Sequence, residues 1–278
     1  MRKFFHELAY TCHKTWVLLT RDMSSNPTFE QKVDIFGGHF RLGTGDYIFQ
    51  SSSPTSTSGG IRYIVFLRDP LVRYVSGVLY QNKIFGRIES LEQVVKKIKD
   101  HIVNQRKNDL YMKKSLTYLL MPAQRDRFMD KSTKAKAMLA IQNLHKYNVI
   151  LGMAERMPES LAILRHVFLK SGVETPLKDK AEAVFQKYGI IASLAKNGMG
   201  NHTAPSVSAV GVHENESSGN NVSTSAVVAE LAKDKEHVPL MEEYIKYERM
   251  ITDFAWIMHN LQYDCVMWEQ STADRTNE

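Results

Sequence analysis

The chain has 278 residues, 43% of them hydrophobic and 24% charged, a composition typical of an ordinary globular protein and not of a disordered one. Thirty-six lysines and arginines against 30 aspartates and glutamates give a formal net charge of +6, a mild bias towards anionic partners. No apolar run approaches the roughly 18 residues of a membrane span, and we expect neither a membrane anchor nor a signal peptide within this chain.

The front of the chain predicts a helix followed by two extended segments. Apolar residues at three- to four-residue spacing indicate an amphipathic helix over residues 2–20. A short strand is expected within residues 32–40, ending at a Gly-Gly-His turn, and a surface loop over residues 50–60. The next run, RYIVFL over residues 62–67, predicts a strand buried on both faces of a parallel sheet, because it is short, apolar and β-rich.

A helix is expected directly after this strand. Asp69 can cap it and Pro70 can occupy its first turn, with the helix reaching about residue 81. Helical patterns recur over residues 91–105, 134–145, 159–169 and 180–194, and a second strand is expected over residues 148–153. This alternation predicts an α/β fold with a central parallel sheet flanked by helices.

The last third of the chain predicts a loop and a long helix. Residues 203–225 are rich in Ser, Asn, Gly and Val and indicate a mobile loop. Apolar residues from Leu240 to Leu261 mark a final helix whose spacing resembles a coiled-coil seam, although we interpret it as a helix packed on its own domain. One domain is expected over residues 1–265, followed by a polar tail at 266–278.

The two cysteines lie at opposite ends of the chain. Cys12 and Cys265 are too far apart in sequence for zinc-ribbon or CxxC chemistry. They leave either a buried thiol pair or one long-range disulfide. No metal site is expected.

Residues 68–80, RDPLVRYVSGVLY, carry the most chemistry. A helix N-terminus at the carboxyl end of a strand offers N–H groups and partial positive charge to a phosphate, and the guanidinium of Arg68 adds a bidentate donor. Arg73, Ser76 and Tyr80 follow on one face of the helix. The alternative is purely structural, with Asp69 capping the helix and pairing with Arg73.

This strand-R-D-P-x-x-R-x-x-S-x-x-x-Y pattern resembles the 3′-phosphate-binding motif of sulfotransferases that use 3′-phosphoadenosine 5′-phosphosulfate (PAPS). Residues 147–156, YNVILGMAER, resemble the family's strand and G-x-T-E turn, with Ala154 in place of Thr. The final helix, with Tyr244 and Tyr247, is similar to that of the Golgi carbohydrate sulfotransferases, including uronosyl 2-O-sulfotransferases. The resemblance runs from the first helix to about Asp264. It implies a P-loop-like sulfotransferase fold and transfer of a sulfuryl group from PAPS to a carbohydrate hydroxyl.

The resemblance assigns roles to individual residues. Arg68 and Ser76 would bind the 3′-phosphate of PAPS, while Asp69 and Arg73 would hold the turn in shape. The segment KNGMGN, from Lys196 through Gly200 to Asn201, looks like the basic glycine-containing loop that closes over the nucleotide. The structural alternative for this segment is a flexible helix end with a glycine cap.

His39 is the candidate general base, because related enzymes present a G-H or H-x-H segment upstream of the phosphate motif. An imidazole suits removal of a proton from an acceptor hydroxyl. Gly37 stands where the first histidine of H-x-H would be, so one base is implied, and a lone structural histidine is the alternative. Glu155 is a second, weaker candidate that we interpret as a turn-holding carboxylate.

The sequence departs from the family at its front. These enzymes have a P-K-x-G-x-[ST] loop before the first helix that cradles the 5′-phosphosulfate, and here the chain begins at that helix. Positioning and charge stabilisation supply most of the catalysis in such transfers. We therefore expect a fragment, a mispredicted start or a degenerate member. The alternative function is a catalytically deficient protein that binds nucleotide or glycan without turnover.

Partners and location follow from the resemblance. It implies the Golgi lumen, membrane association through a segment absent from this chain, and an anionic or neutral glycan acceptor. Glycosylation sequons at Asn201, Asn215 and Asn221 are consistent with a lumenal chain. A generic anion-binding or nucleic-acid-binding protein is a further rival, but the basic residues are scattered and not interleaved with aromatic ones, so we expect no nucleic-acid partner.

Overall fold

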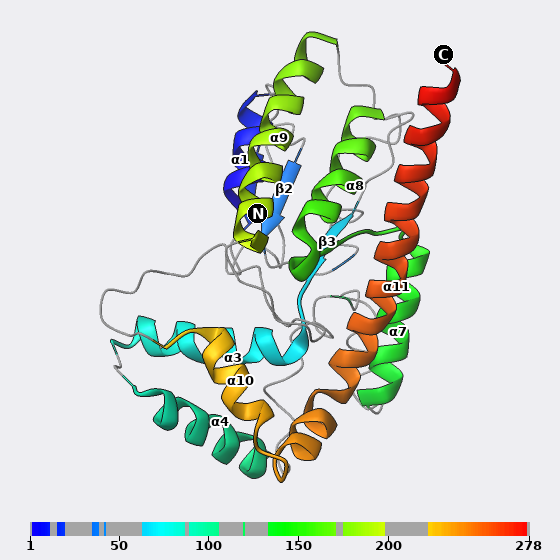
Figure 1. Ribbon diagram of the computed structural model, residues 1–278. Helices are drawn as coiled ribbons and strands as arrows, with labels where there is room; N and C mark the ends of the chain where they lie inside the picture. Colours follow the sequence, from blue (N-terminus) through cyan, green and yellow to red (C-terminus); the bar gives the residue numbers. More distant parts are fainter. Residues whose placement is uncertain are drawn as a thin grey trace.

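The computed structural model describes residues 2–11, 16–19, 35–38, 42, 63–86, 89–105, 119, 133–170, 175–197 and 222–276 (Figure 1). The elements in chain order are α1 (Arg2–Thr11), β1 (Trp16–Leu19), β2 (Ile35–Gly38), β3 (Ile64–Leu67), α3 (Pro70–Ile84), α4 (Leu91–Gln105), α7 (Thr133–Lys146), β4 (Ile150–Met153), the 3₁₀ turn η2 (Ala154–Arg156), α8 (Met157–Lys170), α9 (Thr175–Asn197), α10 (Thr224–Ala232) and α11 (Val238–Thr276).

The helix expected over residues 2–20 is wrong in its second half. It ends at Thr11, and residues 16–19, the apolar run WVLL, form strand β1 instead. The long-range pairing of β1 with β2 overrides the helical spacing. Two further differences lie near the other end of the chain. Helix α10 begins at Thr224, within the expected loop, and α11 continues to Thr276 through the stretch expected to be a polar tail.

The described strands form two parallel pairs rather than one central sheet. β1 pairs with β2, and β3 pairs with β4 with Leu67 opposite Met153. Parallel strands need a crossover connection, and α3, α4 and α7 lie between β3 and β4 in the chain. The molecule is mostly helical, and its general class is α/β, as predicted.

Helix α11 connects the apolar clusters of the described fold, because residues of its successive turns belong to three different clusters. Met241 packs with α3, α4 and α10, Ile251 and Ala255 pack with β3, β4 and α7, and Val266 packs with α1, α8 and α9. Figure 1 shows this helix along the right side of the molecule, where it passes α3 and α4 at its lower end and α7 and α8 further up. The prediction that the final helix packs on its own domain is confirmed.

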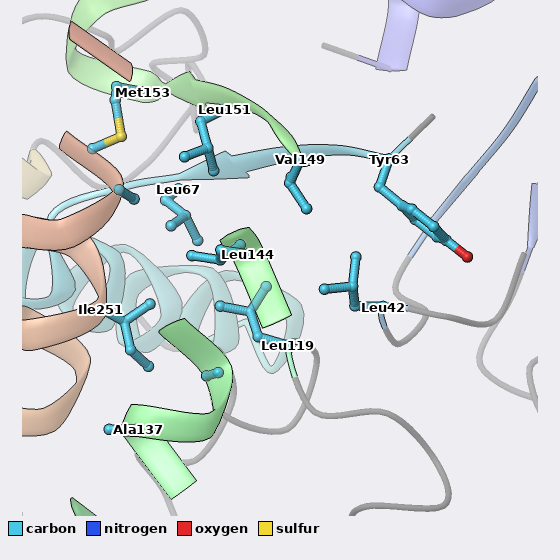
Figure 2. Close-up of a cluster of buried hydrophobic side chains, with 12 residues drawn as sticks. Leu42, Tyr63, Leu67, Leu119, Ala137, Leu144, Val149, Leu151, Met153 and Ile251 are labelled. Atoms are coloured by element: carbon cyan, nitrogen blue, oxygen red, sulfur yellow. The ribbon is translucent and has the colours of Figure 1, made fainter. Parts of the chain in front are cut away.

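The central cluster lies beneath strands β3 and β4 (Figure 2). Leu67, Leu151 and Met153 point from the strands towards Leu144 of α7 and Ile251 of α11. Every residue of β4 is buried, in keeping with the apolar run ILGM. On the edge that faces away from β3, the backbone of this strand is hydrogen-bonded by the Gln262 side chain of α11. Gln262 accepts from Leu151 N–H at 3.0 Å and donates to Val149 C=O at 2.8 Å.

Gly152 is required where the two strands meet. It lies opposite Phe66, and a Cβ added at Gly152 would stand 2.2 Å from the Phe66 ring. We expect Gly152→Ala to lower the free energy of unfolding by about 1–3 kcal/mol, because the ring must leave its packed position. Urea denaturation measures the change. Gly77→Ala, at an exposed helical site with open space, is the matched control and should not destabilise the protein; an equally stable Gly152→Ala would contradict the packing.

Candidate anion-binding site

The fold brings together two segments that are far apart in the sequence, at the carboxyl ends of β3 and β4. Because these parallel strands end in register, Arg68 and Asp69 leave the sheet beside Ala154 and Glu155. The backbone N–H of Asp69 donates to Glu155 Oε1 at 2.8 Å. The two motifs that carry the resemblance therefore meet at one edge of the sheet.

Asp69 holds the turn, as predicted. Its Oδ1 accepts from the N–H groups of Leu71 and Val72 at 2.9 and 3.0 Å, which caps α3. Its Oδ2 accepts from Arg249 of α11 at 2.5 Å, so the alternative in which Asp69 pairs with Arg73 is wrong. The cap therefore occupies N–H groups at the start of α3 that would otherwise be available to a phosphate. An anion here would therefore depend on side-chain donors and on the helix dipole.

Arg73 also has a structural partner. Its guanidinium donates to Glu248 Oε2 at 2.9 Å, and Glu248 is almost completely buried, at 3% exposure. Arg249 completes the cluster by pairing with Glu242 at 3.0 Å in addition to Asp69. Burial tends to lower the pKa of Arg249, but Asp69 and Glu242 outweigh it, so the pKa is raised and the charge is secured.

Arg68 differs from its neighbours. Within the part of the chain that the structure describes, no hydrogen bond or ion pair engages its half-buried guanidinium. Burial lowers the pKa of Arg68, while the charges of Glu155 and Asp69 nearby act in the opposite direction. A partly desolvated guanidinium without a direct partner is costly, and an anionic ligand would supply the missing partner.

Glu155 combines a structural bond with an enclosed oxygen. Oε1 receives the Asp69 N–H, whereas Oε2 is enclosed and has no hydrogen-bond partner within the described ranges. Burial raises the pKa of Glu155 despite the lowering effect of the Asp69 N–H and of Arg68. This geometry supports the turn-holding interpretation of Glu155.

The remaining predicted residues are only partly placed. Ser76 is half-buried on the face of α3 that also carries Arg73 and the exposed Tyr80. Lys196 lies in the last turn of α9, and its side chain is not described. Helix α9 returns along α8, so it ends towards the carboxyl ends of the strands (Figure 1). His39, Gly200, Cys12 and the three sequon asparagines lie outside the described residues.

A buried network that the sequence did not reveal lies behind this site. Ser160 Oγ and His259 Nε2 are 3.0 Å apart, and both residues have 0% exposure. The same hydroxyl accepts from Met153 N–H at 2.9 Å and contacts Arg156 C=O at 2.8 Å, so it ties β4 to the first turn of α8. Because solvent does not reach the pair, we interpret it as structural rather than catalytic.

The comparisons with known proteins identify no relative. No family model, no curated protein and no solved structure matches the chain. Among the residues that the structure describes, no helix is both long and apolar enough to cross a membrane. The same residues contain no group of three or more histidine, cysteine or acidic side chains suited to a metal ion.

Proposed function

We propose that this chain is a PAPS-dependent sulfotransferase that transfers a sulfuryl group to a hydroxyl of a carbohydrate, with a P-loop-like sulfotransferase fold. The observation that carries the proposal is Arg68. It stands at the carboxyl end of a parallel strand, before a helix N-terminus, without a partner among the described residues, while Arg73 and Arg249 are both ion-paired. The surrounding motif resembles the 3′-phosphate-binding motif of PAPS-dependent sulfotransferases, and the anion that we propose is therefore a 3′-phosphate.

The proposed roles divide the site into a donor end and an acceptor end. Arg68 and Ser76 bind the 3′-phosphate of PAPS, and Lys196 and Gly200 belong to the loop that closes over the nucleotide. His39 takes the proton from the acceptor hydroxyl as the sulfuryl group moves to that oxygen and 3′-phosphoadenosine 5′-phosphate departs. The formal charge of +6 favours an anionic glycan as acceptor. The lumen of the Golgi is the proposed location.

Calorimetric titration with 3′-phosphoadenosine 5′-phosphate tests the donor end. We expect the wild-type chain to bind and Arg68→Ala to bind roughly 10- to 100-fold more weakly, the loss of about 1.5–3 kcal/mol for a hydrogen bond to a charged group. Arg165→Ala is the matched control, because it removes a guanidinium that pairs with Glu182 on α9, away from the strand ends. Equal binding by wild type and Arg68→Ala, or no binding by a folded wild-type chain, would contradict the proposal.

Binding alone does not establish transfer. The second candidate is a protein that binds the nucleotide without turnover. Transfer of radiolabelled sulfate from PAPS to a glycan separates the two. Transfer that is lost in His39→Ala supports the enzyme, whereas nucleotide binding without any transfer supports the non-catalytic protein.

A further inference from the structure

Two carboxylates act on the half-buried guanidinium of Arg68, and they differ in how they are held. The charges of Glu155 and Asp69 both reach this guanidinium. Asp69 is paired directly with Arg249, whereas no cation contacts Glu155 within the ranges that the structure describes. Glu155 Oε1 accepts from the Asp69 N–H at 2.8 Å, and the enclosed Oε2 has no hydrogen-bond partner among the same residues. Arg68 and Glu155 therefore balance each other's charge without a direct ion pair.

An anion at Arg68 would upset this balance. A phosphate group carries nearly two negative charges at neutral pH, so its binding would set the phosphate and the Glu155 carboxylate against a single guanidinium. Acidic groups that share one site repel each other, and the repulsion is relieved when one of them takes up a proton. Glu155 is suited to take it up, because burial already raises the pKa of this carboxyl.

The other charged or titratable groups described on the adjoining elements are engaged elsewhere. They are Arg73 with its partner Glu248, Arg156 with its partner Glu159, and Arg249, Asp253 and His259 of α11. Arg249 is paired with Asp69 and Glu242. The charges that act on Asp253 come from these same three groups and not from Arg68. The pKa of His259 is about 4, so this buried imidazole stays neutral near pH 7.

We propose that the anion at Arg68 binds together with a proton, which Glu155 takes from solvent, so that the site holds a phosphate more tightly as the pH falls. This inference rests on the proposed function, since it concerns the same anion. The sign follows from linkage: an anion that favours protonated Glu155 is itself favoured by protonated Glu155. The affinity is greatest where Glu155 is already protonated, and it declines as rising pH removes that proton.

Calorimetric titration with 3′-phosphoadenosine 5′-phosphate at pH 8 and pH 5 tests the linkage. Glu155→Gln resembles the protonated carboxyl, keeps an oxygen for the Asp69 N–H and cannot titrate. At pH 8 we expect Glu155→Gln to bind the nucleotide about tenfold more tightly than wild type, because a negative charge has left the site. At pH 5 the difference should narrow to about twofold or less, because Glu155 of the wild type is then largely protonated. Comparing the two proteins at each pH cancels the titration of the ligand's own phosphates.

Glu182→Gln is the matched control, because Glu182 pairs with Arg165 between α8 and α9, away from the strand ends. It should bind as wild type does at both pH values. A second measurement needs no substitution. Inorganic sulfate stays a dianion over this pH range, so its competition with the nucleotide should show several-fold tighter binding to the wild type at pH 5 than at pH 8.

The outcomes separate this inference from the proposed function. If Glu155→Gln exceeded wild type by the same factor at both pH values, or bound no more tightly at pH 8, the inference would be overturned. Sulfate binding that does not change with pH would overturn it as well. In each case, weaker binding by Arg68→Ala would leave the donor site standing. Failure of a folded wild-type chain to bind the nucleotide at either pH would overturn both.

Discussion

Replacing Arg73 with alanine is expected to lower the free energy of unfolding by about 3 kcal/mol, because it leaves the buried carboxylate of Glu248 without the guanidinium that it contacts at 2.9 Å. For a chain of this size, the loss corresponds to a fall of about 6–12 °C in melting temperature. Calorimetry or urea denaturation measures it. The effect is large because Glu248 is buried, and because the ion pair joins α3 to α11 across 175 residues of chain.

A double replacement separates the cost of removing one partner from the value of the pair. In Arg73→Leu, Glu248→Leu both charges are removed together, so most of the lost stability should return. Lys246→Ala is a matched control, because it removes an exposed cation that pairs with Glu243 one turn away on the same helix. If Arg73→Ala proved as stable as wild type, the buried ion pair would have no structural role.

Acidification is expected to destabilise the protein through His259. Burial, reinforced by the charge of Arg156, lowers the pKa of His259 to about 4, whereas an unfolded histidine has a pKa near 6.5. The unfolded state therefore binds more protons between these values. The stability contributed by neutral His259 is therefore present in full above pH 6.5 and is lost progressively as the pH falls towards 4. Between pH 7 and pH 5 the loss from this one group is about 2 kcal/mol.

A variant comparison isolates this contribution from the other titrating groups. His259→Gln cannot accept the proton, so its stability should fall by about 2 kcal/mol less than that of wild type between pH 7 and pH 5. His145→Gln, at an exposed position on α7, should retain the wild-type loss. Urea denaturation of wild type and both variants at the two pH values gives the three differences. Parallel behaviour of wild type and His259→Gln would show that His259 is not the buried neutral base.

Structural features that depend on neighbouring residues could be predicted from the sequence. Asp69 before Pro70 predicted the start of α3, and the structure confirms both the cap and the first turn. The apolar runs near residues 62–67 and 148–153 predicted β3 and β4. Every residue of β4 is buried, whereas Ile64 of β3 is exposed and only Leu67 is fully buried, so the expectation that β3 is buried on both faces is wrong. The cap and the positions of the strands were predicted correctly because the interactions that decide them lie within a few residues along the chain.

The front of the chain shows where local patterns fail. Residues 16–19 continue the helical spacing of α1, yet they form β1, because pairing with β2 is available only once the chain has folded. The same reasoning applies to the division of the strands into two pairs, since register and neighbours are properties of the tertiary structure.

The candidate site divides in the same way. The sequence by itself placed Arg68 at the end of a strand and predicted Asp69 as a cap, because both depend on adjacent residues. Only the tertiary structure decided that Arg249 holds Asp69 and that Glu248 takes Arg73, which leaves Arg68 as the guanidinium without a partner among the described residues. The ion-pair partners lie about 180 residues apart in the chain, and α11 brings them together by burying its apolar turns in three cores. Hydrophobic burial sets that helix in place, and the charged contacts at its surface follow from its position.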